Sequence, residues 1–194
     1  MSIKWNKNGI IVQDVNETDD CQTLVPYMGV GRFSSWPLSA KSDKVSTKLT
    51  AEAEEKWFGY YYGESFSLAV IPSMEYIESY IGVCKKKNIK IRVLYVETNR
   101  SYPKWNGPEL NTMFLGYDYA TSQDFFSVIF DDLYGENTPP MLTKFKTSLN
   151  SNGLFSTEDT LLAYIETRHR AIEQGYDLEK HGDFCMYRIW SVMT

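Results

Sequence analysis

The sequence predicts a mixed α+β fold: a single domain over residues 1–194, with a central, mostly antiparallel or mixed sheet and helices packed on it. Segments with helical spacing of apolar residues and segments with strand-like character follow one another, between residues 71 and 119 in particular. The 194 residues are 43% hydrophobic and 23% charged, which is the balance of a globular protein. A chain of this length buries roughly 70% of the surface that it exposes when unfolded, so one well-filled core is expected.

The amino-terminal segment predicts a β-hairpin. Residues 3–5 and 10–15 are strand-like and flank residues 6–9, which include Asn6 and Gly9. These residue types favour tight turns, and Gly9 can adopt the backbone angles that such a turn needs. Residues 19–50 then combine prolines and glycines with aromatic residues in no regular period. That pattern indicates a long packed loop.

The middle of the chain predicts two helices separated by a strand. Thr50 can cap a helix with acidic residues in its first turn, and residues 65–71 have the character of a strand. The clearest helix begins at Ser73 and runs to about Lys87, because apolar residues recur along one face at helical spacing. The residues on that face are Met74, Ile77, Ile81 and Cys84.

Residues 89–98 and 113–119 predict two further strands. The continuously apolar end of the first indicates a strand that is covered on both faces. Residues 124–134 predict an acidic amphipathic helix, and Pro139 and Pro140 mark the start of another element.

The carboxy-terminal region predicts a helix and then a strand. The helix covers residues 157–174, with Ser156 as its cap and Gly175 at its end. Its apolar face consists of Leu161, Leu162, Ile165 and Ile172. Residues 184–192 alternate in the manner of a strand. One side carries Phe184, Met186 and Arg188, and the other carries Cys185, Tyr187 and Ile189.

Charge and composition restrict the partners and the compartment. The formal net charge of −5 argues against a nucleic-acid partner, which calls for a cationic face. It fits a cationic protein partner, although a modest negative charge also keeps an ordinary cytosolic protein soluble. Three widely spaced cysteines encode neither a disulfide framework nor a zinc cage. Neither a signal peptide nor a membrane span is apparent, so a cytoplasmic protein is expected.

Residues that carry catalytic chemistry are scarce. His169 and His181 are the two histidines, and His169 is expected on the apolar face of the last helix as a core residue. His181, Asp183 and Cys185 are close in sequence and resemble a nucleophile or metal-ligand group only loosely. We therefore expect no catalytic residue set, no metal and no cofactor.

Carboxylates are the remaining candidates, and they allow two uses. Asp118, at a strand end, could serve as a general acid or base. Asp131 and Asp132 project about a hundred degrees apart on a helix, so they cannot easily line one small site. Solvated surface acids are the simplest interpretation. Alternatively, an acidic surface with exposed rings would capture a basic protein rapidly. The predicted partner-binding residues are Asp118, Asp124, Asp131, Asp132 and Glu136.

Residues 114–133, FLGYDYATSQDFFSVIFDDL, resemble a segment of immunity proteins from bacterial polymorphic toxin systems, including contact-dependent growth inhibition. The resemblance implies a small acidic cytosolic protein that binds the toxic C-terminal domain of a sister cell's effector, often a basic nuclease. These proteins are diverse in fold, so the resemblance assigns no partner-binding residue.

Two other functions stay open on the sequence. One is a small enzyme with a carboxylate-based site near Asp118, which predicts a deep pocket and a strongly raised carboxylate pKa. The other is a small-molecule or scaffold binding domain built from the tyrosines and tryptophans.

Overall fold

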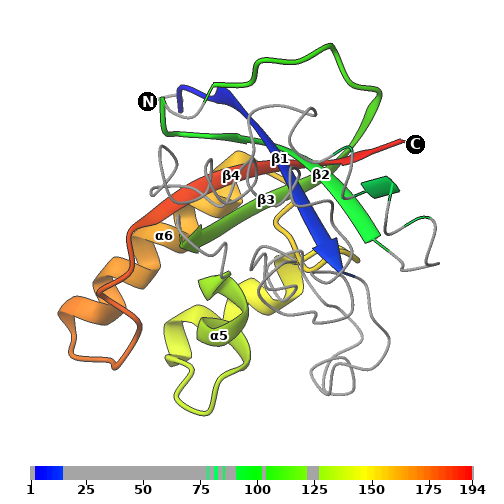
Figure 1. The fold of residues 1–194 in the computed structure, drawn as a ribbon. Helices are drawn as coiled ribbons and strands as arrows, with labels where there is room; N and C mark the ends of the chain where they lie inside the picture. Colours follow the sequence, from blue (N-terminus) through cyan, green and yellow to red (C-terminus); the bar gives the residue numbers. More distant parts are fainter. Residues whose placement is uncertain are drawn as a thin grey trace.

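The computed structural model describes residues 3–14, 78, 81–82, 85, 91–101, 104–121 and 127–193 (Figure 1). They form an α+β fold around a four-stranded sheet in the order β1-β2-β4-β3. The strands are β1 (Asn6–Asp14), β2 (Ile91–Thr98), β3 (Thr112–Thr121) and β4 (Phe184–Val192). Every neighbouring pair is antiparallel, which confirms the predicted fold class. The last strand of the chain is inserted between β2 and β3.

The described residues between β3 and β4 form three helical elements. They are α5 (Val128–Tyr134), the 3-10 helix η4 (Pro140–Ser148) and α6 (Glu158–Glu173). Among the described residues, α5 begins at Val128, and Asp124, the predicted start of this helix, lies outside them. The predicted start of an element at Pro139 and Pro140 is confirmed by η4. None of the helices in the described part of the chain is long and apolar enough to cross a membrane.

The predicted amino-terminal hairpin is wrong. Residues 6–9 lie inside β1, which pairs along its length with β2, and the register shifts between Lys7 and Gly9. Gly9 has φ +154° at this bulge, a conformation that favours glycine. Glycine is found at bulges as well as in turns. The sequence pattern therefore correctly indicated an irregular backbone at Gly9, but the chain does not reverse there.

The predictions for residues 19–50, for the helix capped by Thr50 and for the strand at 65–71 lie outside the described residues. Within the predicted helix at 73–87, the described residues Glu78, Ile81, Gly82 and Lys85 are helical. Ile81 is buried, whereas Glu78 and Lys85 are exposed. This difference agrees with the predicted apolar face.

Helix α6 matches its predicted bounds within one residue, but its cap and its buried face differ. Thr157, not Ser156, is the N-cap, since its side chain accepts a hydrogen bond from the Thr160 amide. The residues buried along α6 are Leu161, Tyr164, Thr167, Arg168 and Ala171, while Leu162, Ile165 and Ile172 are partly buried. His169 is exposed, so its predicted place in the core is wrong.

The core has two parts, one on each face of the sheet. The predicted alternation of β4 is confirmed, because Cys185, Tyr187 and Ile189 are all buried. They pack with Leu94 and Val96 on one face. On the other face, β3 packs against the three helical elements through a cluster that includes Tyr117, Leu133, Leu142, Phe155, Leu161 and Tyr164. The second face carries the surface features described below.

Gly116 allows β3 to approach the segment after η4 closely. It has φ +147°, and a Cβ there would lie 2.7 Å from the Leu154 Cβ and 2.8 Å from the Phe155 carbonyl oxygen. Tyr117 and Phe155 exchange backbone hydrogen bonds of 2.8 and 3.0 Å beside it. Residue 116 therefore needs a glycine for both backbone conformation and space.

Gly116→Ala should lower the free energy of unfolding by about 2 kcal/mol, because it combines a strained φ with a clash against backbone. Urea unfolding followed by circular dichroism measures this. Gly82→Ala is the matched control, since a Cβ at Gly82 meets nothing within 4 Å. Equal stability of the two variants would contradict the assignment.

Candidate functional site

The structure separates the acidic residues that were predicted to form one partner-binding surface. Asp118 is 1% exposed and Asp132 is 3% exposed, so neither can present its charge to a partner. This part of the prediction is wrong, because both side chains turn toward groups in the interior. Asp131 and Glu136 are exposed. Asp124 lies outside the described residues.

Asp118 is held by two hydrogen bonds, both to one oxygen. Its Oδ1 accepts from the Ser127 hydroxyl at 2.6 Å and from the Tyr119 amide at 2.8 Å. Its Oδ2 is buried and has no hydrogen-bond partner among the described residues. Burial raises the pKa of Asp118 from its ordinary value of 3.8 to about 6, and the bonds from Ser127 and Tyr119 oppose that rise. A raised carboxylate pKa is one of the two features that an enzyme site here predicts.

Asp132 is one partner of a buried ion pair that joins α5 to α6. The Arg168 Nε donates to its Oδ2 at 2.6 Å, and the Tyr164 hydroxyl donates to the same oxygen. The Arg168 Nη2 donates to the Glu179 carbonyl oxygen, which ties the segment after α6 to the pair. Burial raises the pKa of Asp132, and Arg168 acts against that rise. These contacts indicate that Asp132 has a structural role.

The loose group around the start of β4 does not form a reactive site. Cys185 is buried, and burial raises the pKa of its thiol to about 12. Such a thiol is protonated at neutral pH and is a weak nucleophile. Asp183 pairs with Arg100, and His181 is exposed. In the described part of the chain, no group of three or more histidine, cysteine or acidic side chains is arranged to hold a metal ion.

A continuous group of rings lies on the sheet face that carries the helices, and we call it the aromatic face. It follows two cross-strand rows: Tyr95, Trp190 and Phe114 form one, and Glu97, Arg188 and Tyr117 form the other. Ring centroids lie 5.7 Å apart for Tyr95 and Trp190, and 5.4 Å apart for Trp190 and Phe114. The residues of the aromatic face are Trp5, Tyr95, Trp105, Phe114, Tyr117, Arg188 and Trp190.

Arg188 is at the centre of the aromatic face. Its guanidinium carbon lies 5.3 Å from the ring centroids of Trp5 and Trp190 and 5.9 Å from that of Tyr117. Its Nη1 donates to the Glu97 Oε2 at 3.2 Å. These cation–π and ionic contacts fix the guanidinium in place. Its Nε is buried without a hydrogen-bond partner in the described structure.

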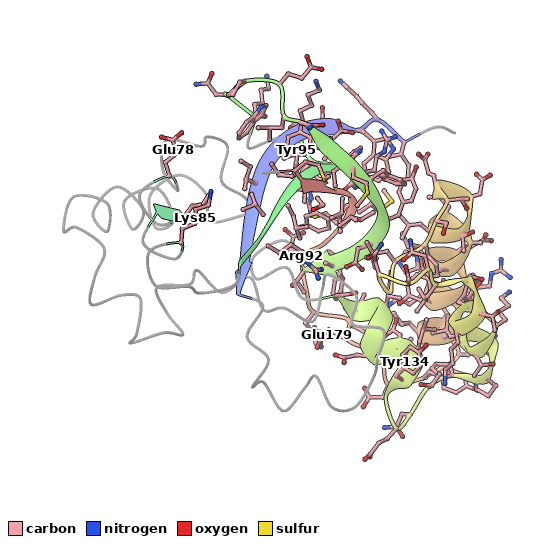
Figure 2. The ribbon with its side chains drawn as sticks, turned by 90° about the vertical axis from the view of Figure 1, so that its right-hand side faces the viewer. Glu78, Lys85, Arg92, Tyr95, Tyr134 and Glu179 are labelled. Atoms are coloured by element: carbon pink, nitrogen blue, oxygen red, sulfur yellow. The ribbon has the colours of Figure 1, made fainter. Side chains whose placement is uncertain are left out.

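In the described part of the chain, the helices cover one end of this sheet face and not the other. Tyr119 and Met186 pack against the cluster formed with α6, whereas Phe114 is 42% exposed. Figure 1 shows α6 beside the start of β4, with the carboxy-terminal end of β4 extending away from it. Figure 2 shows Tyr95 on β2 well separated from Tyr134 on α5. The aromatic face is therefore a different surface from the exposed acids near Tyr134.

A half-open cleft of about 380 Å³ adjoins the aromatic face. Residues that line it include Lys7, Tyr95, Glu97, Trp105, Glu109 and Trp190. The loop at 104–110 closes one side, held by a bond from the Trp105 amide to the Lys7 carbonyl oxygen and one from its indole to the Pro108 carbonyl oxygen, both 3.0 Å. Asp118 does not line this cleft, so the raised pKa and the cleft occur in different places.

The sequence contained a partial indication of the aromatic face. Alternation along β4 places Arg188 and Trp190 on the same side of the strand, and aromatic residues make up 15% of the chain. It did not indicate which strands lie on either side of β4. Without that strand order, the positions of Tyr95 and Phe114 beside Trp190 could not be predicted.

Comparisons of the chain with family models, with curated proteins and with solved structures found no match. The class of protein is therefore defined by its own geometry: an α+β fold whose sheet carries a partly exposed face of aromatic rings and an arginine beside its helices.

Proposed function

We propose that this chain is an immunity protein that binds a cognate secreted toxin domain and neutralises it in the bacterial cytoplasm, without catalysis of its own. The aromatic face is the observation that carries the proposal. Tryptophan, tyrosine and arginine are the residues most enriched where protein interfaces gain their binding energy. Within the aromatic face Phe114 is exposed, Tyr95 and Tyr117 are buried, and the other members are partly exposed. A partly exposed cluster of this composition is typical of a surface that a partner covers.

The segment that resembles immunity proteins overlaps the aromatic face, although the resemblance itself assigns no partner-binding residue. Residues 114–133 include Phe114 and Tyr117, which belong to the aromatic face. They also include Asp118 and Asp132, which are buried. In this proposal the segment therefore serves both the core and the binding surface. The net charge of −5 favours a basic toxin domain, because opposite charge speeds association.

A carboxylate enzyme at Asp118 is the second candidate, favoured by the raised pKa of that residue. The two functions differ in what Asp118→Asn does. A general acid or base would lose its activity with this change, whereas a binding protein would keep its affinity, since the side chain is buried away from any partner.

The proposal predicts that the gene immediately upstream encodes a large secreted protein. The deciding experiment is co-expression of the chain with the C-terminal domain of that protein, scored by cell survival and by pull-down. Survival that depends on the chain, together with a stoichiometric complex, would support the proposal. Unchanged killing, with no complex recovered, would refute it.

Phe114→Ala and Trp190→Ala should each weaken binding of that toxin domain by about 2 kcal/mol, because each removes an aromatic ring from the proposed interface. Isothermal titration calorimetry measures this, and circular dichroism checks that the variants are folded. Tyr134→Ala is the control, since Tyr134 is an exposed ring on α5, away from the aromatic face (Figure 2). Equal losses in all three variants would remove the aromatic face as the binding surface.

A further inference from the structure

Aromatic rings and carboxylates line the cleft beside Trp190. The ring centroids of Trp105 and Trp190 lie 5.9 and 5.7 Å from that of Tyr95. Glu97 and Glu109 line the same cleft. The Glu97 side chain is 14% exposed and uses Oε2 for Arg188. A cleft with this lining offers a cation both π faces and carboxylate oxygens.

The neighbouring part of the aromatic face already holds a cation in this way. Arg188 lies over the rings of Trp5, Tyr117 and Trp190 and pairs with Glu97. Trp190 and Glu97 belong to both places, because they contact Arg188 and also line the cleft. Arg188 therefore shows which groups hold a guanidinium on this surface: aromatic rings together with a carboxylate.

We propose that the cleft is a receptor for an arginine side chain of the protein partner. This inference rests on the proposed function for the nature of the partner, and it names the group on that partner that the cleft takes. A guanidinium is planar and weakly hydrated, so it stacks on rings more readily than an ammonium does. The cleft volume of about 380 Å³ is ample for such a group.

The lining of the cleft carries two carboxylates, Glu97 and Glu109, and one ammonium, Lys7. Arg188 already pairs with Glu97, so Glu109 is the carboxylate that an incoming cation meets. Lys7 and Glu109 are both exposed, so water and salt screen the repulsion of the one and the attraction of the other. The preference for a cation over an anion therefore rests mainly on the rings. The ring faces are themselves negative and repel a carboxylate. Lys7 therefore opposes the occupant weakly, and its removal should favour binding.

The test is a titration of the full chain with the blocked tripeptide acetyl-Gly-Arg-Gly-amide, followed by the indole N–H resonances of the tryptophans. We expect saturable shifts for Trp105 and Trp190. The Trp5 indole, which donates to the Glu158 Oε2 at 2.8 Å, is the internal reference and should not shift. The same tripeptide with citrulline in place of arginine has nearly the same shape without the charge, and it should bind at least about ten-fold more weakly.

Two single substitutions on the cleft lining should act in opposite directions. Glu109→Gln should weaken binding of the arginine tripeptide about two- to five-fold, and Lys7→Gln should strengthen it by a similar factor. Both side chains are exposed, so both variants should remain folded. Affinity changes of opposite sign distinguish a cleft that selects its ligand by charge from a surface that binds the peptide nonspecifically.

Absence of saturable shifts at Trp105 and Trp190 would overturn the proposal, as would equal binding of the citrulline tripeptide or the same direction of change in both variants. The titration needs no toxin domain. Its failure would therefore leave the co-expression result standing, and failure of co-expression would leave the peptide result standing.

Discussion

Arg168→Met is expected to lower the free energy of unfolding by about 4 kcal/mol, because it leaves the buried Asp132 carboxylate without its charge partner. Both side chains are almost fully buried, and their atoms meet at 2.6 Å. Methionine fills much of the same volume, so the loss reports mainly the unpaired charge and the broken hydrogen bonds rather than a cavity. Urea unfolding at neutral pH measures it.

The effect of Arg168→Met should depend on pH in a defined direction. Without Arg168, burial acts unopposed by that cation and raises the pKa of Asp132 further. A carboxyl whose pKa is raised in the folded state binds more protons in that state than in the unfolded state. Stability therefore falls as the pH rises from the unfolded pKa to the folded pKa. The loss should therefore be larger at about pH 7.5 than at about pH 4.5.

Arg170→Met is the matched control for Arg168→Met. Arg170 is on the same helix and pairs with Glu166, but both side chains of that pair are exposed. An exposed pair contributes at most about 1 kcal/mol. Equal losses in the two variants would show that the buried pair has no special role in stability.

Asp118→Asn is expected to stabilise the protein at neutral pH by about 2 kcal/mol. The folded pKa of about 6 against an ordinary value of 3.8 means that ionised Asp118 costs about 3 kcal/mol above pH 6 or so. Asparagine removes the charge and can still accept from Ser127 and the Tyr119 amide. The asparagine amide nitrogen introduces a buried N–H donor, which reduces the expected gain in stability by about 1 kcal/mol.

The gain from Asp118→Asn should disappear in acid. Because the folded pKa is raised, the penalty grows between about pH 4 and about pH 6 and is absent once Asp118 is protonated in both states. Urea unfolding at about pH 4.5 and about pH 7.5 should therefore show a smaller gain, or a small loss, at the lower pH. Asp177→Asn, at an exposed acid, should change stability little at either pH. A change in stability of the same sign and size at both pH values for Asp118→Asn would contradict the raised pKa.

The two predictions concern acids that the sequence placed on the surface. Asp132 follows Asp131 directly, and nothing local separates their roles. Helical geometry did indicate that they point in different directions, and the structure shows one exposed and the other buried. Which one is buried depends on Arg168, a partner that is 36 residues away.

Between residues 91 and 193, the positions of strands and helices were largely predictable from the sequence, because their causes are local. The period of two in β4, the spacing of apolar residues near α6, and Gly175 after its end each involve residues that are neighbours along the chain. The bounds of α6 shifted by one residue because Thr157, rather than Ser156, has its side chain positioned to accept the Thr160 amide. Such errors are small, since either hydroxyl can serve as a cap.

The sequence by itself determined the α+β class, three of the four described strands and the course of the last helix, since periodicity and capping depend on nearby residues. Only the tertiary structure decided that β4 lies between β2 and β3, that Asp118 and Asp132 are buried, and that Tyr95 and Phe114 meet on either side of Trp190. The physical reason is that strand pairing and ion pairing join residues distant in sequence, and their free energy depends on the whole packed arrangement rather than on any local pattern.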